Sequence, residues 1–326
     1  MSEFQLIRRL QEIICLPEHE HRPECVIGIG DDAAVLEVPA GQQLVVCTDT
    51  LVEGIHFPSA TSPRAIGHKS LAVNLSDLAA MGAAPAWFFM ALSLPEHDQD
   101  WLDAFAQGMA ELANRSCISL AGGDVTGGGL SICITALGLV ENNQALTRAG
   151  AQQDDLVLVS GRPGAAANAL RLLKSGGEPR ADDLAALEFP QPRLDLGRAL
   201  HGIATACIDL SDGLLADLGH ILEQSGGGAE LELGRLPCPP GLEGLPAEER
   251  WPLQLAGGDD YELCFTAKPS SLDQIDSVAV ACGIQITVIG SITSGAGIKL
   301  RKPGGGLYEP VQAGYEHFQQ TAGAGE

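Results

Sequence analysis

The chain has 326 residues, of which 45% are hydrophobic and only 4% aromatic. This length exceeds what one compact core usually organises, so we expect two domains of ordinary size. The 42 acidic residues outnumber the 19 basic ones, which gives a formal net charge of −23. A charge of this sign repels nucleic acid and anionic membranes, and we expect neither as a partner.

The nine cysteines are scattered and never form a Cys-x-x-Cys pair. Their odd number, the lack of a signal peptide and the lack of an apolar run long enough to span a bilayer predict reduced thiols in the cytoplasm. We therefore expect neither disulfides nor a zinc cage.

Hydrophobic spacing and turn residues predict the secondary structure. The elements expected in the first half are a helix at 4–14, strands at 34–38 and 44–47, a helix from Ser62 to Met81, a strand at 87–94, a helix at 102–112, and strands at 118–120 and 130–140. The strand at 44–47 is expected to present Thr48, Asp49 and Thr50 at its carboxyl end, where ligands often bind.

A polar segment at 141–155 predicts a domain boundary, which we place between domains at 1–148 and 149–326. The elements expected in the second half are a strand at 156–159, an alanine-rich helix ending at Lys174, a helix at 214–224, a strand at 263–265, a helix at 271–282, and strands at 287–292 and 298–301. Strands and helices mix without a strict βαβ rhythm, which favours an α+β fold of two mixed domains.

Two acidic stretches attract attention: GIGDDA at 28–33 and DLSDG at 209–213. Each places two carboxylates beside glycines at the end of an apolar run. Carboxylates that lie close together repel one another, so they persist only where water, backbone amides or a cation compensates them. We infer a cation.

The first stretch also matches the dinucleotide-binding pattern Gly-x-Gly-x-x-Ala, with Asp49 about 20 residues further on. That pattern requires a helix N-terminus at the pyrophosphate, but residues 34–38 alternate like a strand and are followed by Pro39. We therefore exclude a Rossmann fold. The Walker phosphate loop and the protein-kinase motifs are absent from the sequence.

Seven aspartates follow predicted strands or flank glycines. They are Asp31, Asp32, Asp49, Asp77, Asp124, Asp209 and Asp212. Hard oxygen ligands without thiolate or imidazole partners suit Mg²⁺, which takes one or two carboxylates per ion and completes its shell with water and phosphate. So many acids indicate several ions and a polyanionic substrate.

Other readings of these residues stay open. Asp31 either joins this set or only forms its own turn, and Asp98 and Asp100 are expected as N-terminal caps of the following helix. His56 is expected to close a turn, and the alternative is that it contacts the substrate. Arg148 is expected to face solvent, and the alternative is that it binds a phosphate.

Seven motifs occur in an order that resembles the thiamine-monophosphate kinase family, within the aminoimidazole-ribonucleotide synthetase-like superfamily. They are GIGDDAAVL at 28–36, TDTLVEGIHF at 48–57, KSLAVNLSDLAAMGA at 69–83, GGD at 122–124, LTRAGA at 146–151, IDLSDGL at 208–214 and GGDDYELCF at 257–265. The resemblance implies ATP-dependent phosphorylation of thiamine monophosphate to thiamine diphosphate. It also implies a homodimer formed through the N-terminal sheet and a C-terminal domain that closes over the site.

The resemblance further implies roles for individual residues. Mg²⁺ would be held by Asp32, Cys47, Thr48, Asp49, Asp77, Asp124, Asp209 and Asp212. ATP would contact Gly123, Asp124, Arg148 and Ser211, and the thiamine phosphate would contact His56, Asp259 and Tyr315. Asp259 replaces the usual Glu of the family, and Cys47 stands where Ser or Thr is common.

The acceptor is a phosphate monoester with a second pKa near 6, so it is already an anionic nucleophile and needs no strong base. We assign no general base and expect direct in-line transfer with several Mg²⁺ ions between the two anions. The alternatives are another ATP-dependent member of the superfamily, such as aminoimidazole-ribonucleotide or selenophosphate synthetase, and a non-enzymatic protein that binds divalent ions.

Overall fold

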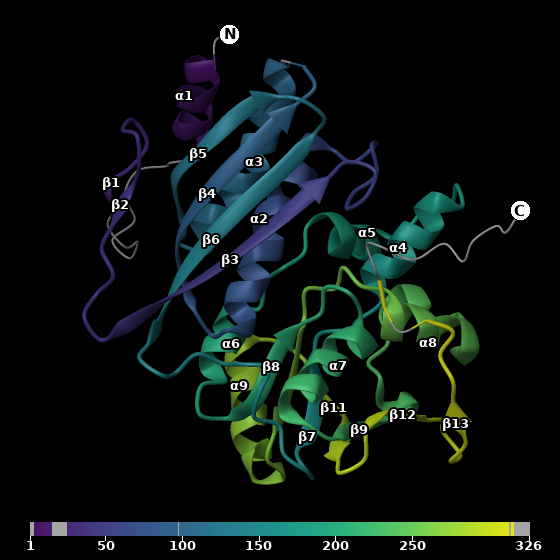
Figure 1. The fold of residues 1–326 in the computed structure, drawn as a ribbon. Helices are drawn as coiled ribbons and strands as arrows, with labels where there is room; N and C mark the ends of the chain where they lie inside the picture. Colours follow the sequence, from purple (N-terminus) through teal and green to yellow (C-terminus); the bar gives the residue numbers. More distant parts are fainter. Residues whose placement is uncertain (1–2, 15–24, 97, 313, 316–326) are drawn as a thin grey trace, which may run out of the picture.

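The computed structural model describes residues 3–14, 25–96, 98–312 and 314–315, and it shows two lobes that are each built on a sheet (Figure 1). The first lobe contains α1 (Glu3–Ile14), β1 (Cys25–Ile27), β2 (Val35–Leu36), β3 (Gln42–Val52), α2 (Pro63–Ala80), β4 (Ala84–Leu94), α3 (Gln99–Arg115), β5 (Ser119–Gly127) and β6 (Ser131–Glu141). Its main sheet has the strand order β3-β6-β4-β5, and β1 pairs with β2 separately.

The second lobe is built on a seven-stranded sheet with the order β13-β12-β9-β11-β7-β10-β8. Its strands are β7 (Leu156–Ser160), β8 (Ala204–Asp209), β9 (Gly228–Glu232), β10 (Leu263–Ala267), β11 (Ile286–Thr293), β12 (Gly297–Arg301) and β13 (Leu307–Tyr308). Its helices are α4 (Ala165–Lys174), α5 (Ala181–Glu188), α6 (Leu194–Ala199), α7 (Leu214–Ser225), α8 (Ala247–Ala256) and α9 (Leu272–Cys282), with 3-10 turns at Leu233–Arg235, Pro240–Leu242 and Pro269–Ser271.

Both sheets are mixed. In the first, β4 and β5 are parallel while β3 and β6 are antiparallel, and in the second only the β9–β12 pairing is parallel among the described ladders. The predicted α+β fold class is therefore confirmed. None of the helices in the described part of the chain has both the length and the apolar character needed to cross a membrane.

Two predicted strand ends are wrong, because both strands continue through polar residues. β3 extends to Val52, so Thr48, Asp49 and Thr50 lie inside the strand and not at its end. β5 runs through Gly122, Gly123 and Asp124, which the sequence had placed after a short strand. Strand pairing on the neighbouring chain segments overrides local composition at both places.

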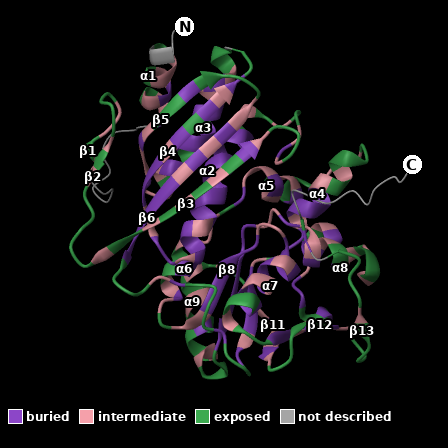
Figure 2. Ribbon diagram, viewed as in Figure 1, coloured by how far each residue is buried: buried purple, intermediate pink, exposed green. Residues whose placement is uncertain are grey.

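The helix α2 lies between the lobes and is buried on nearly all sides (Figure 2). It begins as the sequence predicts, because the Ser62 hydroxyl accepts a hydrogen bond from the Ala65 amide at 3.3 Å and Pro63 follows the cap. At its other end it touches α6, where a Cβ on Gly197 would lie 1.9 Å from the Ala79 carbonyl oxygen. Only glycine allows this approach of the two backbones.

Candidate functional site

Four aspartates meet where the two lobes join, and we call them the interdomain acidic cluster. They are Asp49 of β3, Asp77 of α2, Asp209 at the end of β8 and Asp212 in the loop that follows. Their carboxylates repel one another: the charges of Asp209 and Asp49 raise the pKa of Asp77, and the charge of Asp212 raises the pKa of Asp49. A cavity of about 350 Å³ opens between the lobes here, lined by Asp77 and Asp209 together with Arg148.

Burial and mutual repulsion shift the protonation of this cluster. Burial raises the pKa of Asp77 to about 8, and the neighbouring carboxylates of Asp209 and Asp49 add to the rise. Burial also raises the pKa of Asp209 to about 6, opposed by the Ser76 hydroxyl that donates to its carboxylate at 2.8 Å. A divalent cation bound among these groups would relieve both effects, so the donor set fits a hard metal ion.

The cluster is not a ready-made cage. Within the ranges that the structure describes, no three His, Cys, Asp or Glu side chains group in a way that could hold a metal ion. Mg²⁺ commonly keeps several waters and binds through one or two carboxylates plus substrate phosphate. A site whose side chains supply only part of the coordination shell therefore suits this ion.

Polar groups of α2 fix the strand that carries Asp49. The Asn74 side-chain oxygen accepts a hydrogen bond from the Asp49 amide at 3.2 Å, and the Cys47 thiol donates to the Asn74 carbonyl oxygen at 3.3 Å. Burial raises the pKa of this thiol, and the carboxylates of Asp77 and Asp49 raise it further. The sulfur therefore stays protonated, and a protonated thiol is not the form of cysteine that binds a metal ion.

The side chain of Thr48 does not face this cluster. Its hydroxyl is 2.8 Å from the Thr135 hydroxyl of β6, while Cys47 faces α2. Successive side chains of a strand point to opposite faces, so Thr48 lies on the outer face of the sheet.

The loop at 257–262 lies against the DLSDG loop through three backbone hydrogen bonds. The amides of Asp259 and Tyr261 donate to the carbonyls of Ser211 and Leu210, each at 2.8 Å. The Leu210 amide donates back to Glu262 at the same distance.

This loop adopts an unusual backbone conformation. Asp259 and Tyr261 have φ angles of 61° and 49°, a region that ordinary residues rarely occupy. Such strain concentrates at functional sites, because the surrounding structure must hold it in place.

The loop that carries Asp212 is held by a residue that the sequence did not single out. One carboxylate oxygen of Asp217 accepts hydrogen bonds from the amides of Asp212 at 3.2 Å and Gly213 at 3.0 Å. The N-cap residue of α7 is Gly213, which has no side chain to cap the helix, and Asp217 binds the free amides from inside the first turn. Burial raises the pKa of Asp217 to about 8, with further contributions from Asp209 and Asp212.

The three residues predicted to contact substrate lie around the interdomain acidic cluster. His56 closes a turn, because its Nδ1 accepts from the Val52 amide at 2.9 Å, and it interacts electrostatically with Asp49. The Asp259 carboxylate forms an ion pair with the Lys69 ammonium group, with an O–N distance of 3.0 Å. The amide of Tyr315 donates a hydrogen bond to the Asp212 carbonyl oxygen at 3.0 Å.

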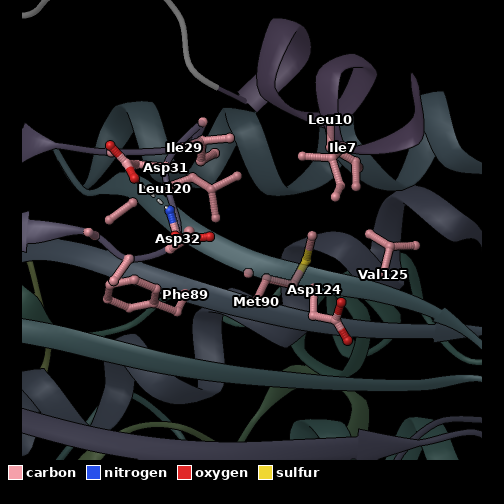
Figure 3. Close-up of a pocket in the computed structure, with 17 residues that line it drawn as sticks. Ile7, Leu10, Ile29, Asp31, Asp32, Phe89, Met90, Leu120, Asp124 and Val125 are labelled. Carbon is pink, nitrogen blue, oxygen red and sulfur yellow. Dashed lines mark hydrogen bonds between the residues drawn. The ribbon is translucent and has the colours of Figure 1, made fainter. Parts of the chain in front are cut away.

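The other predicted ligands line a second hollow, which we call the β5-edge pocket. It has a volume of about 530 Å³ and contains Asp31, Asp32, Gly123 and Asp124. Figure 3 shows the Asp124 carboxylate pointing away from Ile7 and Leu10 of α1, which cover another side of the pocket. The Asp31 carboxylate accepts from the Asp32 amide at 2.9 Å, so Asp31 does form its own turn.

Strand register separates these two groups of acids. Asp49 on β3 pairs with Ile134 on β6, and Ile134 pairs with Met90 on β4. Met90 in turn pairs with Gly123 on β5. Three strand spacings of about 4.8 Å place the two edges roughly 14 Å apart. Within one chain the predicted ligands therefore form two sets, not one.

Sequence reasoning missed five polar residues that hold this site together: Lys69, Asn74, Ser76, Asp217 and Tyr261. The only signal in the sequence was a polar side chain within an otherwise apolar or small-residue helix, as for Lys69, Asn74 and Ser76. Their partners lie on other elements, which no local pattern reveals.

Comparison with known proteins agrees with this architecture. The family AIR synthase related protein matches twice, with its N-terminal domain over residues 30–140 and its C-terminal domain over residues 152–302. The thiamine-monophosphate kinase of Haemophilus influenzae is 39% identical over 98% of this chain and 99% of its own length.

Solved structures extend the likeness to three dimensions. The crystal structure of thiamine-monophosphate kinase from Stenotrophomonas maltophilia is 44% identical, with a TM-score of 0.84 over 92% of this chain and 96% of that one. The structure of AaThiL complexed with AMPPCP and TMP is 28% identical, with a TM-score of 0.75 and coverage of 97% of both chains. The chain therefore belongs to the thiamine-monophosphate kinase family, a group of phosphotransferases within the AIR synthase related proteins.

Proposed function

We propose that this protein transfers the terminal phosphoryl group of ATP to thiamine monophosphate and so forms thiamine diphosphate. The observation that carries the proposal is the interdomain acidic cluster, in which burial and neighbouring carboxylates raise the pKa of Asp77 to about 8. Such a cluster suits a site that gathers divalent cations with polyanions. The AaThiL complex with AMPPCP and TMP supports the choice of the two substrates.

The residues proposed to hold Mg²⁺ come from both lobes. They are Asp32, Asp49, Asp77, Asp124, Asp209 and Asp212, together with Thr48 and with Cys47, which would act through its backbone carbonyl. Bound Mg²⁺ would neutralise the phosphates and bring the two anions together. Gly123, Arg148 and Ser211 are the proposed ATP contacts, and Arg148 lies close enough to Asp209 to lower its pKa.

The remaining protein groups orient the acceptor. His56, Asp259 and Tyr315 surround the interdomain acidic cluster and are the proposed contacts of thiamine monophosphate. The acceptor phosphate is anionic at neutral pH, so none of these residues needs to act as a general base. We propose a direct in-line transfer, in which positioning and charge neutralisation supply the catalysis.

We also propose that the functional unit is a homodimer formed through the N-terminal sheet. The outer face of β3 carries the exposed side chains of Leu44 (40%) and Val46 (55%). A second chain seated on this face would also offer a way to bring the β5-edge pocket of one chain to the interdomain acidic cluster of the other. The separation of the two ligand sets within one chain supports this arrangement.

The test is an ATP-consumption assay with thiamine, thiamine monophosphate and aminoimidazole-ribonucleotide precursors side by side. We expect ADP release with thiamine monophosphate only, together with formation of thiamine diphosphate. Activity with free thiamine but not its monophosphate would overturn the substrate. Activity with an aminoimidazole precursor would favour the synthetase alternative, and divalent-ion binding without any ADP release would favour the non-enzymatic one.

A further inference from the structure

Lys69 is a buried cation at the junction of the two lobes. Its side chain is only 3% exposed, although lysine is rarely buried. Its ammonium group lies 3.0 Å from a carboxylate oxygen of Asp259 and donates a hydrogen bond to the His56 carbonyl oxygen at 3.3 Å. Both partners are residues that the proposed function places at the thiamine phosphate.

Stability alone does not account for this lysine. Taking an ammonium group out of water is costly, and an apolar pair at such a junction is often as stable as a buried ion pair or more stable. The partner carboxylate is held in a strained position, since Asp259 has a φ angle of 61°. Its other oxygen accepts from the Tyr261 hydroxyl at 2.9 Å, so the carboxylate is aimed at Lys69.

The surroundings of Lys69 are otherwise acidic. Glu188 of α5 is close enough for Lys69 to lower its pKa against the rise that burial causes. Asp49 and Asp209 interact electrostatically with Tyr261, the residue that orients the lysine's partner. A dianionic phosphate entering this region from solvent would meet carboxylates on most sides, and Lys69 offers it a fixed positive charge in addition to the Mg²⁺ proposed above.

We propose that Lys69 binds the phosphate of thiamine monophosphate and positions it for transfer. The proposal rests on the proposed function and adds a residue to the acceptor site. In the unliganded protein the Asp259 carboxylate takes the place of the phosphate on the ammonium group. When the substrate binds, its phosphate contacts Lys69 as a point charge. Asp259 is then free to face the positively charged thiazolium ring.

The test compares two ligands that differ only in the phosphate. Binding of thiamine monophosphate and of thiamine is measured by calorimetry with Mg²⁺ and AMPPCP present, for the wild type, Lys69→Met and Lys69→Arg. We expect Lys69→Met to weaken thiamine monophosphate binding by about 10- to 100-fold, as for the loss of a hydrogen bond to a charged group. The affinity for thiamine should change by less than about 2-fold, because thiamine has no phosphate that could contact Lys69.

Kinetics give an independent readout. Lys69→Met should raise the KM for thiamine monophosphate and leave the KM for ATP nearly unchanged. Lys69→Arg, which keeps the charge, should recover most of the loss. The matched control is Lys268→Met, which removes a positive charge from an exposed position just after β10. It should leave both KM values unchanged.

The outcomes separate the two proposals. If the wild type does not phosphorylate thiamine monophosphate, the proposed function fails. If the wild type is active but Lys69→Met weakens thiamine and its monophosphate equally, or neither, Lys69 is only an interdomain contact and this inference fails alone. If Lys69→Met does not fold, Lys69→Gln, which removes the charge and keeps a hydrogen-bond donor, decides: a loss confined to thiamine monophosphate supports the inference, and an equal effect on both ligands, or none, overturns it.

Discussion

Asp212 lies in a loop whose backbone is held from two sides. Its amide donates to Asp217, and its carbonyl accepts from the Tyr315 amide. The side chain is thus placed by contacts that do not involve its own carboxylate. Replacing that carboxylate by an amide should change the charge of the site and leave the loop in place.

We therefore expect Asp212→Asn to abolish turnover with thiamine monophosphate, because the amide loses the negative charge that a divalent cation requires. The measurement is the ATP-consumption assay together with a thermal melt to show that the fold is intact. Asp276→Asn, at an exposed position on α9, is the control for removing one charge. A fully active Asp212→Asn protein would remove this residue from the proposed metal ligands.

The buried carboxylates also predict how stability depends on pH. The folded-state pKa values of Asp77 and Asp217 are raised to about 8, against about 3.9 in an unfolded chain. Between pH 4 and pH 8 the folded protein holds protons that the unfolded chain has already released, so stability falls as pH rises. Without divalent cations, we expect the free energy of unfolding to be lower at pH 8.5 than at pH 6 by about 2 kcal/mol or more.

Urea denaturation with a chelator at both pH values measures this difference. Asp217→Asn should reduce it, because the amide cannot take up or release the proton. Equal stability of the wild type at the two pH values would show that these carboxylates are not held in the protonated form.

At the scale of elements, the loop at 257–262 depends on glycine. Gly258 has a φ of 68°, and a Cβ added there would lie 2.7 Å from the Ser211 carbonyl oxygen. We expect Gly258→Ala to destabilise the protein by about 1–3 kcal/mol through strain and to lower turnover by moving Asp259. Gly244→Ala is the control, since nothing lies within 4 Å of its added Cβ. Denaturation midpoints and turnover that match the wild type would contradict the expectation.

The same scale shows what local sequence could and could not predict. Residues with strong local signals were read correctly, such as the Ser62-Pro63 start of α2 and the cap at Asp98, whose carboxylate accepts from the Asp100 and Trp101 amides. Short or amphiphilic elements such as α5, α6, α8, β9 and β13 were missed. They form because the rest of the second lobe packs against them, and packing is not visible in a sequence window.

The candidate site divides in the same way. The acidic residues of the proposed site stand out in the sequence because several carboxylates lie beside glycines, and the family resemblance adds the roles that we propose for them. Lys69 and Asp217 do not stand out, because a lysine or an aspartate within a helix usually faces solvent. Their roles depend on Asp259 and on the amides of the DLSDG loop, contacts that exist only in the folded protein.

At the scale of the whole molecule, the two ligand sets predict how mutant chains combine. We expect Asp49→Asn and Asp124→Asn to be inactive alone and to regain about a quarter of wild-type activity when co-expressed with different tags. In a twofold dimer, half of the random pairs are mixed, and each mixed pair rebuilds one of its two sites if the sets come from different chains. The measurement is the activity of the co-expressed mixture and of the isolated mixed dimers, which should reach about half of the wild-type activity.

Asp49→Asn combined with Asp77→Asn is the matched control for this experiment. Both residues belong to the interdomain acidic cluster of one chain, so no mixed pair can rebuild a site. No recovery in the Asp49 and Asp124 mixture would mean that each chain completes its own site.

The helix α2 carries both Lys69 and Asp77, eight residues apart, and is enclosed by both lobes. Eight residues of α-helix span about 12 Å, a length that bond geometry holds constant. On our proposals, this interval sets how far the anchored end of the acceptor lies from the ion-binding aspartates. The distance between the acceptor phosphate and the ion-binding aspartates would thus be fixed by the helix. Analogues with a longer or shorter linker between ring and phosphate should therefore be poor acceptors even when they bind well.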